Sequence, residues 1–231
     1  MKAFGATITL ALASAAEISV MKLQYMNHVA KYGKYIDSAD EFATRMGYFT
    51  EADKVIEKHN TGSHSFTMAH NQFSDWSKDE YEYLLGCKAD DDNAEKTFKT
   101  FDESNNDMTV DWSAIGAVTP VKDQGNCGSC WAFSATGALE SKHWIESGHL
   151  LSFSEQQQVS CNEPCGGCDG YGPSFAFDFW KETNAATEDD YPYKGHDSSC
   201  KHDYDKSDVS ISSWANVTSN DVSQFKAALY F

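Results

Sequence analysis

Residues Gln124 to Ser134 read Gln-Gly-Asn-Cys-Gly-Ser-Cys-Trp-Ala-Phe-Ser, and this stretch decides the fold. A helix is predicted to begin at Ser129 or Cys130, directly after a turn that contains two glycines. The exposed N–H groups and the dipole of a helix N-terminus lower the pKa of a thiol, so Cys130 is suited to act as a nucleophile. Gln124 lies just upstream, where its amide could donate to a developing oxyanion.

Three other roles for Cys127 and Cys130 remain open at this point. They could form a redox pair, although no thioredoxin-like strand–helix context surrounds them. They could bind zinc with Cys165 and Cys168, which repeat the spacing, or Cys127 could do so with Cys161, Cys165 and Cys168. Both could instead be structural disulfide partners. On the motif alone, these three readings together outweigh catalysis.

Composition and the N-terminus narrow the class of protein. The chain has 231 residues and a formal net charge of −17, which argues against a DNA or RNA partner. Lys2, an apolar run and the small residues at 14–16 are typical of an export signal, predicted at 1–16. No other segment has transmembrane length, so we expect a soluble mature protein with no membrane partner. The seven cysteines suggest disulfides after export, and their odd number leaves at least one free or paired between chains: Cys87, Cys127, Cys130, Cys161, Cys165, Cys168 and Cys200.

The sequence pattern divides the chain near residue 108. Residues 17–86 read as helical, and two acidic runs between 88 and 107 predict a solvated linker. Beyond Val110 we predict a helix ending near Glu146 with Gly148 as its stop, a loop from Cys161, a second helix over 174–182, and a strand from Val209. Six residues spaced three or four apart fall on one face of a predicted helix: Glu41, Arg45, Phe49, Ala52, Ile56 and Asn60.

The run from Gly116 to Ser134 resembles the active-site segment of papain-like cysteine proteases almost without substitution. The resemblance extends to SEQQ at 154–157 and to YPY at 191–193. It implies an α+β fold with a helical left domain, an incomplete β-barrel-like right domain and a helical propeptide in front. It also implies an endopeptidase with Cys130 as nucleophile, forming a thioester, and Gln124 completing the oxyanion hole. No cofactor or metal is implied.

Further residues take roles from the same resemblance. Cys168-Asp169-Gly170 is similar to a motif that lines the substrate cleft of the family. The resemblance makes Gly170, Tyr171 and Pro173 candidate substrate-binding residues. Tyr171, however, replaces a glycine whose backbone binds substrate in the family. The family pairing implies disulfides Cys127–Cys168 and Cys161–Cys200, with Cys127–Cys165 as an alternative for the first.

The N-terminal part resembles cathepsin L-like propeptides. The helix face at 41–60 is similar to their ERFNIN motif, with Ala52 in place of an asparagine, and Asn71, Phe73 and Asp75 are similar to their GNFD motif, with Ala69 in place of its glycine. The resemblance implies a signal peptide at 1–16, an inhibitory propeptide at 17–108 that blocks the cleft, and the start of the peptidase domain at 109–231. It further implies protein or peptide substrates, a monomer, and a lysosomal, vacuolar or extracellular location.

A catalytic base is not evident in these residues. The family's histidine and asparagine fall about 130–150 residues after the cysteine, which places them beyond Phe231. His143 lies thirteen residues along the same predicted helix, roughly 20 Å from Cys130 at 1.5 Å per residue, and we expect His149, His196 and His202 to be surface residues. We therefore expect the chain alone to be inactive, with an inactive fragment or a propeptide-type protease inhibitor as the alternative function.

Overall fold

The structure is a computed structural model that describes residues 19–85, 98–105, 109–163 and 165–230. The chain divides into two compact units, Met1–Lys78 and Asp79–Phe231, called here the first and the second unit. The predicted export signal at 1–16, the predicted boundary at 108 and Cys87 lie outside the described residues. Each unit is described by itself below.

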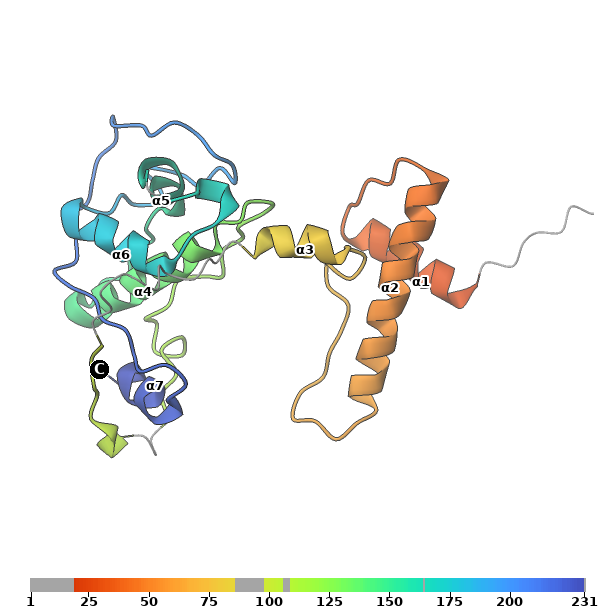
Figure 1. Ribbon diagram of the computed structural model, residues 1–231, viewed down its shortest axis with the longest axis horizontal. Coiled ribbons are helices and arrows are strands. Elements are labelled where there is room, and N and C mark those ends of the chain that lie inside the picture. The colour runs from red at the N-terminus through yellow and green to blue at the C-terminus, as the bar shows by residue number, and fades with distance from the viewer. Residues whose placement is uncertain (1–18, 86–97, 106–108, 164, 231) are drawn as a thin grey trace, which may run out of the picture. The chain divides into compact units, whose positions relative to one another are not determined.

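The first unit is built on helices α1 (Val20–Lys31) and α2 (Ala39–Asn60), the longer of which is plain in Figure 1. The side chain of Ser38 accepts a hydrogen bond from the N–H of Glu41 at 3.1 Å, and the Glu41 carboxylate accepts one from the N–H of Asp37 at 2.9 Å. Because both side chains satisfy free N–H groups at the helix end, they fix where α2 begins. The predicted six-residue face lies on this single helix.

A buried carboxylate organises the core of the first unit. Asp75 is fully buried, accepts a hydrogen bond from the Tyr25 hydroxyl at 3.2 Å and pairs with the ammonium group of Lys34. His28 is also buried, with its Nε2 atom 3.6 Å from the same carboxylate. Burial lowers the pKa of His28, because the charged imidazolium loses hydration there. The core of this unit therefore contains groups whose charge depends on pH.

Side chains of α2 bind the chain that follows the helix. Arg45 pairs with Glu41 at 2.7 Å and donates to the backbone carbonyl of Asp75 at 3.4 Å. The Asn60 side chain holds both the N–H and the carbonyl of Met68, each at 2.8 Å. The polar positions of the predicted propeptide motif thus close the loop after α2.

The apolar positions of that motif pack against the same loop. Phe49 is buried and stacks on the His70 ring with centroids 4.0 Å apart, while Ile56 is half-buried. The Asn71 side chain accepts a hydrogen bond from the N–H of Phe73 at 2.9 Å, which shapes the turn before Asp75. The motif residues are therefore structural in this unit.

The second unit has its core around α4 (Cys130–Ser147), which packs against α5 (Glu155–Cys161) and α6 (Pro173–Glu182). Buried Trp131, Leu139, Phe153 and Trp180 fill the space between these helices, and each large apolar side chain buried this way contributes about 1.5–3 kcal/mol. Two shorter helices and two turns of 3₁₀ helix complete the described elements: α3 (Lys78–Leu84), η1 (Glu103–Asn105), η2 (Gly167–Asp169) and α7 (Val222–Leu229).

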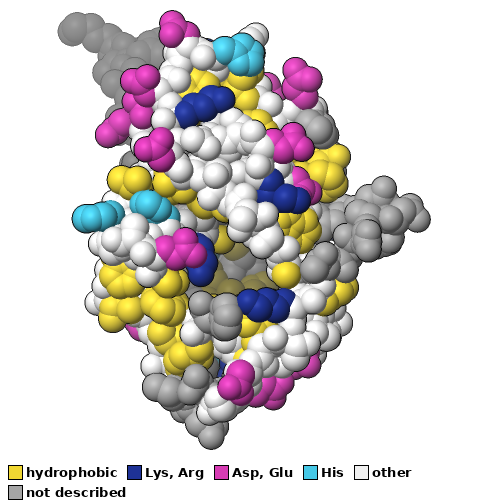
Figure 2. Space-filling view, turned by 90° about the vertical axis from the view of Figure 1, so that its left-hand side faces the viewer, with side chains coloured by type: hydrophobic (Ala, Val, Ile, Leu, Met, Phe, Trp, Pro, Cys, Tyr) yellow, Lys and Arg dark blue, Asp and Glu magenta, His cyan; other side chains and the backbone are white. Residues whose placement is uncertain are grey.

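One face of the second unit is hollowed. A pocket of about 920 Å³ lies between the C-terminal half of α4 and residues 208–215, with Leu139, Val209, Ile211 and Trp214 in its lining. Figure 2 views the molecule from the left-hand side of Figure 1 and shows hydrophobic side chains in separate patches, with acidic side chains scattered over the upper part and grouped at the lower edge.

Two predictions about secondary structure have clear outcomes. The helix predicted to end near Glu146 is confirmed, with Gly148 in the left-handed conformation at its C-terminus (φ 75°). The strand predicted from Val209 is wrong: the described residues contain isolated β-bridges and no strand. The carbonyl of Val209 accepts from Ala185 N–H at 2.8 Å and the N–H of Ile211 donates to Trp180 at 3.1 Å, so this segment satisfies its backbone against the end of α6. Within the described ranges, no helix combines the length and the apolar character needed to cross a membrane.

Candidate active site

Cys130 is the first residue of α4, and its thiol is free and half-buried. The next residue, Trp131, is fully buried and donates from its indole N–H to the Gly167 carbonyl at 3.0 Å. Because this contact anchors the first turn of α4, the position of Cys130 is fixed by packing rather than by its own side chain. Cys130 therefore lies at a helix N-terminus, where the backbone N–H groups of the first turn have no partner within the helix.

The backbone before Cys130 lies against the loop that contains Cys168. The N–H of Gly128 donates to the Cys168 carbonyl at 2.9 Å. A side-chain carbon added at Gly128 would lie 2.4 Å from that same oxygen, so only glycine fits there. A disulfide joins Cys127 to Cys168 beside this contact. The backbone before Cys130 is therefore held in close contact with the backbone of the Cys168 loop, which the absence of a side chain at Gly128 allows.

The amide of Gln124 lies next to this backbone. Its Nε2 donates to the Cys127 carbonyl at 2.8 Å and to the Leu84 carbonyl at 3.2 Å. Leu84, at the end of α3, is 7% exposed and belongs to the same compact unit. The second donor position of Gln124 thus already holds a carbonyl oxygen, the kind of group that an oxyanion donor binds.

The three candidate substrate-binding residues follow Cys168 directly. Gly170 is buried with φ 88°, a conformation that favours glycine. The Tyr171 ring lies edge-on to Trp131 at 6.5 Å and to Phe175 at 4.3 Å. Pro173 is the first residue of α6, where its fixed φ suits a helix start. The structure therefore places residues 170–173 against Trp131, the residue that follows Cys130.

Disulfides occupy four cysteines in the described residues. Cys127 pairs with Cys168 and Cys161 pairs with Cys200, which is the pairing that the resemblance implies, and the alternative Cys127–Cys165 is wrong. Cys165 is free, and burial raises the pKa of its thiol to about 12. Because Cys127 is bound to Cys168, it is not available to form a redox pair with Cys130. A zinc site would likewise lack the thiolates of these two cysteines. Over the residues that can be described, no cluster of His, Cys, Asp and Glu is arranged to hold a metal ion.

The histidines of the second unit have partners other than Cys130. His143 lies within 3.3 Å of the Ser147 hydroxyl, and His149 is exposed at the end of the same turn. His196 contacts the Asp197 carbonyl at 2.9 Å through Nδ1, and exposed His202 lies 3.8 Å from the disulfide-bonded sulfur of Cys200. None of these three contacts involves the Cys130 thiol.

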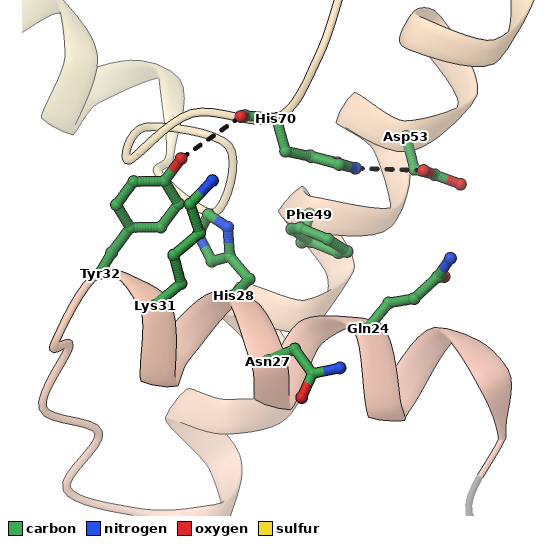
Figure 3. A pocket seen from close by; sticks show the side chains of 8 residues that line it. All are labelled: Gln24, Asn27, His28, Lys31, Tyr32, Phe49, Asp53 and His70. Atoms are coloured by element: carbon green, nitrogen blue, oxygen red, sulfur yellow. Dashed lines mark hydrogen bonds and ion pairs between the residues drawn. The ribbon is translucent and has the colours of Figure 1, made fainter.

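A second pocket, in the first unit, offers different chemistry. Its volume is about 250 Å³, and in Figure 3 the His70 ring points to Asp53 of α2, with Nε2 and the carboxylate 3.1 Å apart. Aromatic and amide side chains from both helices complete it, and no cysteine lines it: Gln24, Asn27, His28, Lys31, Tyr32, Phe49, Asp53 and His70. It lacks the thiol that the sequence motif requires.

A buried charge cluster in the second unit was not expected from the sequence. The Lys122 ammonium lies 2.7 Å from the Glu140 carboxylate and 2.8 Å from that of Glu155. Burial raises the pKa of Glu155 to about 7, although its hydrogen bond to the Lys122 ammonium acts in the opposite direction. The sequence carries a signal for α5, because Ser154 and Gln157 have the spacing of a helix N-terminus, and the Ser154 hydroxyl accepts from the Gln157 N–H at 3.0 Å.

Comparison with known proteins assigns this arrangement to a class. Residues 106–231 match the papain family cysteine protease model, and residues 25–81 match the cathepsin propeptide inhibitor domain. The fold and site thus define a cysteine protease with an inhibitory propeptide domain. The chain belongs to the papain family of cysteine proteases.

Individual relatives agree with the family. The chain is 39% identical over 198 residues to digestive cysteine proteinase 2 of Homarus americanus, covering 82% of this chain and 61% of that relative's length. The structure of procathepsin L 3 from the larval midgut of Tenebrio molitor matches with a TM-score of 0.77 and 30% identity, over 92% of this chain and 71% of that one. A recombinant stem bromelain precursor matches with a TM-score of 0.78 and 30% identity, over 90% and 69%. The chain thus spans about three fifths of the length of its lobster relative.

Proposed function

We propose that this chain is the zymogen part of a cysteine-type endopeptidase in which Cys130 is the nucleophile. One observation carries the proposal: a free thiol at the first residue of α4, with a glutamine amide held beside the same backbone. The Cys130 sulfur attacks the peptide carbonyl carbon, and the carbonyl oxygen takes the negative charge. The Gln124 amide and the Cys130 backbone N–H stabilise that charge. The amine then leaves with a proton from a histidine, and water hydrolyses the thioester.

The same site suggests how the propeptide inhibits. In the proposed organisation, residues 17–108 form the propeptide and 109–231 the start of the peptidase domain. Leu84 belongs to the proposed propeptide, and its carbonyl accepts from the Gln124 amide at 3.2 Å. An oxyanion donor that is already occupied is not available to a substrate, so the backbone at Leu84 acts as the blocking segment.

Substrate recognition is proposed for the loop after Cys168. Gly170, Tyr171 and Pro173 would line the cleft for protein or peptide substrates. The Tyr171 ring packs between Trp131 and Phe175, which supports a role in shaping the cleft wall. Because Tyr171 stands where the family has glycine, we expect fewer backbone contacts to substrate there.

Location and assembly belong to the same proposal. A signal peptide at 1–16 would direct the chain to the secretory pathway, towards a lysosome, a vacuole or the outside of the cell. The two disulfides support an oxidising compartment. We propose that the protein acts as a monomer.

We further propose that these 231 residues do not turn over substrate by themselves. Three of the four histidines of the second unit contact groups other than Cys130, and among the described residues no hydrogen bond joins a histidine to its thiol, which leaves Cys130 without a base. Loss of the base from such a constellation removes several orders of magnitude in rate. Acid-treated protein should therefore cleave a dipeptidyl fluorogenic substrate at the background rate. Turnover that is abolished by Cys130→Ala would contradict this.

The nucleophile itself is tested with an epoxide that alkylates cysteine protease thiols. After acid treatment of the full chain, peptide mapping should find the label on Cys130 and not on the free thiol of Cys165. The Cys165→Ser variant should be labelled like the wild type, and Cys130→Ala should remain unlabelled. A label on Cys165 with none on Cys130, in folded protein, would overturn the proposal.

A second candidate function is inhibition of related proteases through the propeptide. The match of residues 25–81 to a propeptide inhibitor domain favours it. The Cys130→Ala chain should then inhibit an active cathepsin L-like enzyme in a concentration-dependent way. A matched Asp75→Ala variant, which disrupts the core of the first unit, should inhibit far less. Equal inhibition by both proteins, or none by either, would remove this candidate.

A further inference from the structure

The hydroxyl of Tyr193 connects the two sides of the proposed oxyanion site. It lies 2.8 Å from the Gln124 carbonyl and 2.6 Å from the Ser129 hydroxyl. Ser129 is fully buried and directly precedes Cys130, so one phenol touches the residue before the nucleophile and the backbone of the proposed oxyanion donor. Tyr193 is 64 residues away from Ser129 and 69 from Gln124 in sequence.

The direction of these hydrogen bonds follows from counting protons. A phenol has one proton, and the Gln124 carbonyl can only accept, so the Tyr193 proton lies on that bond. The Ser129 hydroxyl must then donate to the Tyr193 oxygen. Its alternative acceptor is the Cys127 carbonyl, which is farther away at 3.5 Å. Tyr193 therefore decides where the Ser129 proton goes.

That choice matters because the Cys127 carbonyl also holds the Gln124 side chain. The Gln124 amide donates to this oxygen at 2.8 Å. Without the Tyr193 hydroxyl, Ser129 would turn to the Cys127 carbonyl and compete with the amide, while the Gln124 backbone would lose its own donor. We propose that Tyr193 is a positioning residue that keeps the Gln124 amide in place for an oxyanion, an inference that rests on the proposed function.

The remainder of Tyr193 is held independently of its hydroxyl. Its backbone N–H donates to the Glu188 carboxylate at 2.8 Å, and its ring lies edge-on to Phe133 of α4 with centroids 4.9 Å apart. Tyr193→Phe should therefore keep the ring and the loop in place and remove only the two hydroxyl contacts. Tyr204→Phe is a matched control, because the Tyr204 hydroxyl accepts one hydrogen bond from Gln157 away from the site.

Two probes of the full chain, applied after acid treatment to release the Leu84 carbonyl from Gln124, separate positioning from general disturbance. With p-nitrophenyl acetate, the Cys130 thiolate adds to the ester carbonyl, p-nitrophenolate leaves with the bonding electrons, and an acetyl thioester forms through an oxyanion. With iodoacetamide, the same thiolate displaces iodide and no oxyanion forms. The ratio of acetylation to alkylation at Cys130, measured by peptide mass at pH 9, reports the oxyanion donors and cancels changes in thiolate content.

We expect Tyr193→Phe to lower this ratio about tenfold, less than the 10²–10³-fold cost of deleting an oxyanion donor outright. Tyr204→Phe and Ser129→Ala should stay within about twofold of wild type, and Ser129→Ala added to Tyr193→Phe should recover part of the loss. Far-UV circular dichroism checks that each variant is folded. If Tyr193→Phe folds less well than the wild type, the comparison of the double variant with Tyr193→Phe alone still tests the inference. An unchanged ratio in Tyr193→Phe, or no recovery, overturns the inference alone. A wild-type Cys130 that reacts with neither probe overturns the proposed function and this inference together.

Discussion

The two compact units are stabilised by different kinds of interaction, and the difference predicts opposite responses to pH. The first unit is organised by the buried Asp75 cluster, in which burial lowers the pKa of His28. The second unit has two disulfides and a buried cluster in which the pKa of Glu155 is raised to about 7.

The signs follow from linkage. A histidine with a lowered pKa binds fewer protons when folded than when unfolded, so the first unit loses stability as pH falls below about 6.5. A glutamate with a raised pKa binds more protons when folded, so the second unit is most stable below its ordinary value of 4.5 and loses stability as pH rises towards 7. From these two groups we expect acid to destabilise the unit that matches the inhibitor domain and to stabilise the unit that contains Cys130.

The largest expected effect breaks the first unit. Asp75→Ala leaves the Lys34 ammonium and the Tyr25 hydroxyl without their buried partner, which should cost about 3–5 kcal/mol. Hydrogen exchange measured by mass spectrometry should show α1 and α2 losing protection, with α4 as the internal reference. Asp53→Ala is the control, because its half-exposed pair with His70 is worth about 1 kcal/mol or less. If the amides of α1 and α2 kept their protection in Asp75→Ala, the buried cluster would not be what stabilises the first unit.

The next effect weakens the second unit. Replacing Cys161 and Cys200 together by serine opens a disulfide with a sequence separation of 39 residues, which should cost about 2–4 kcal/mol. The midpoint of urea unfolding, followed by exchange in α4 and α5, should fall accordingly. Cys165→Ser removes a free thiol instead and should change little. A double variant as stable as Cys165→Ser would show that the disulfide is dispensable.

A smaller effect sharpens the pH contrast in the second unit. Glu155→Gln removes the titrating group, and we expect the loss of stability between pH 5 and 8 to shrink by about 2 kcal/mol, since each pKa unit corresponds to about 1.4 kcal/mol. Urea unfolding at several pH values measures this. Glu163→Gln, at an exposed position, should leave the pH profile as in the wild type. An unaltered profile in Glu155→Gln would place the pH dependence elsewhere.

The smallest effect concerns the first unit at acid pH. His28→Asn keeps a polar side chain but cannot be protonated, so the first unit should lose less stability than the wild type between pH 6.5 and 5. Exchange in α1 reports it, and His64→Asn, which alters an exposed ring, serves as the control. Equal acid sensitivity in His28→Asn and wild type would contradict the assigned cause.

Local patterns in the sequence were enough to predict the local parts of the structure. The start of α4 at Cys130 and its end at Gly148 follow from a glycine turn, a motif and a left-handed cap, all within one stretch. The strand predicted from Val209 failed because alternation of side chains does not supply a neighbouring strand. Helix α5 was missed although Ser154 and Gln157 have the required spacing.

Long-range contacts were beyond the reach of such patterns. Tyr193 stands in a motif that the sequence analysis noted, yet its bonds to Gln124 and Ser129 join residues more than sixty positions apart. The sharing of Lys122 by Glu140 and Glu155 likewise depends on how α4 and α5 pack. These contacts support the proposed site, and only a folded structure reveals them.

The central claim is that Cys130 is the activated thiol, and the free thiol of Cys165 provides the sharpest contrast. Burial raises the pKa of Cys165 to about 12, whereas Cys130 begins a helix. The rate of iodoacetamide alkylation at each cysteine should be measured by peptide mass from pH 5 to 9, in the full chain. We expect Cys130 to react at least about a hundredfold faster than Cys165 at pH 6, because burial keeps the Cys165 thiol protonated. Equal rates at the two cysteines, or faster reaction at Cys165, would contradict the account.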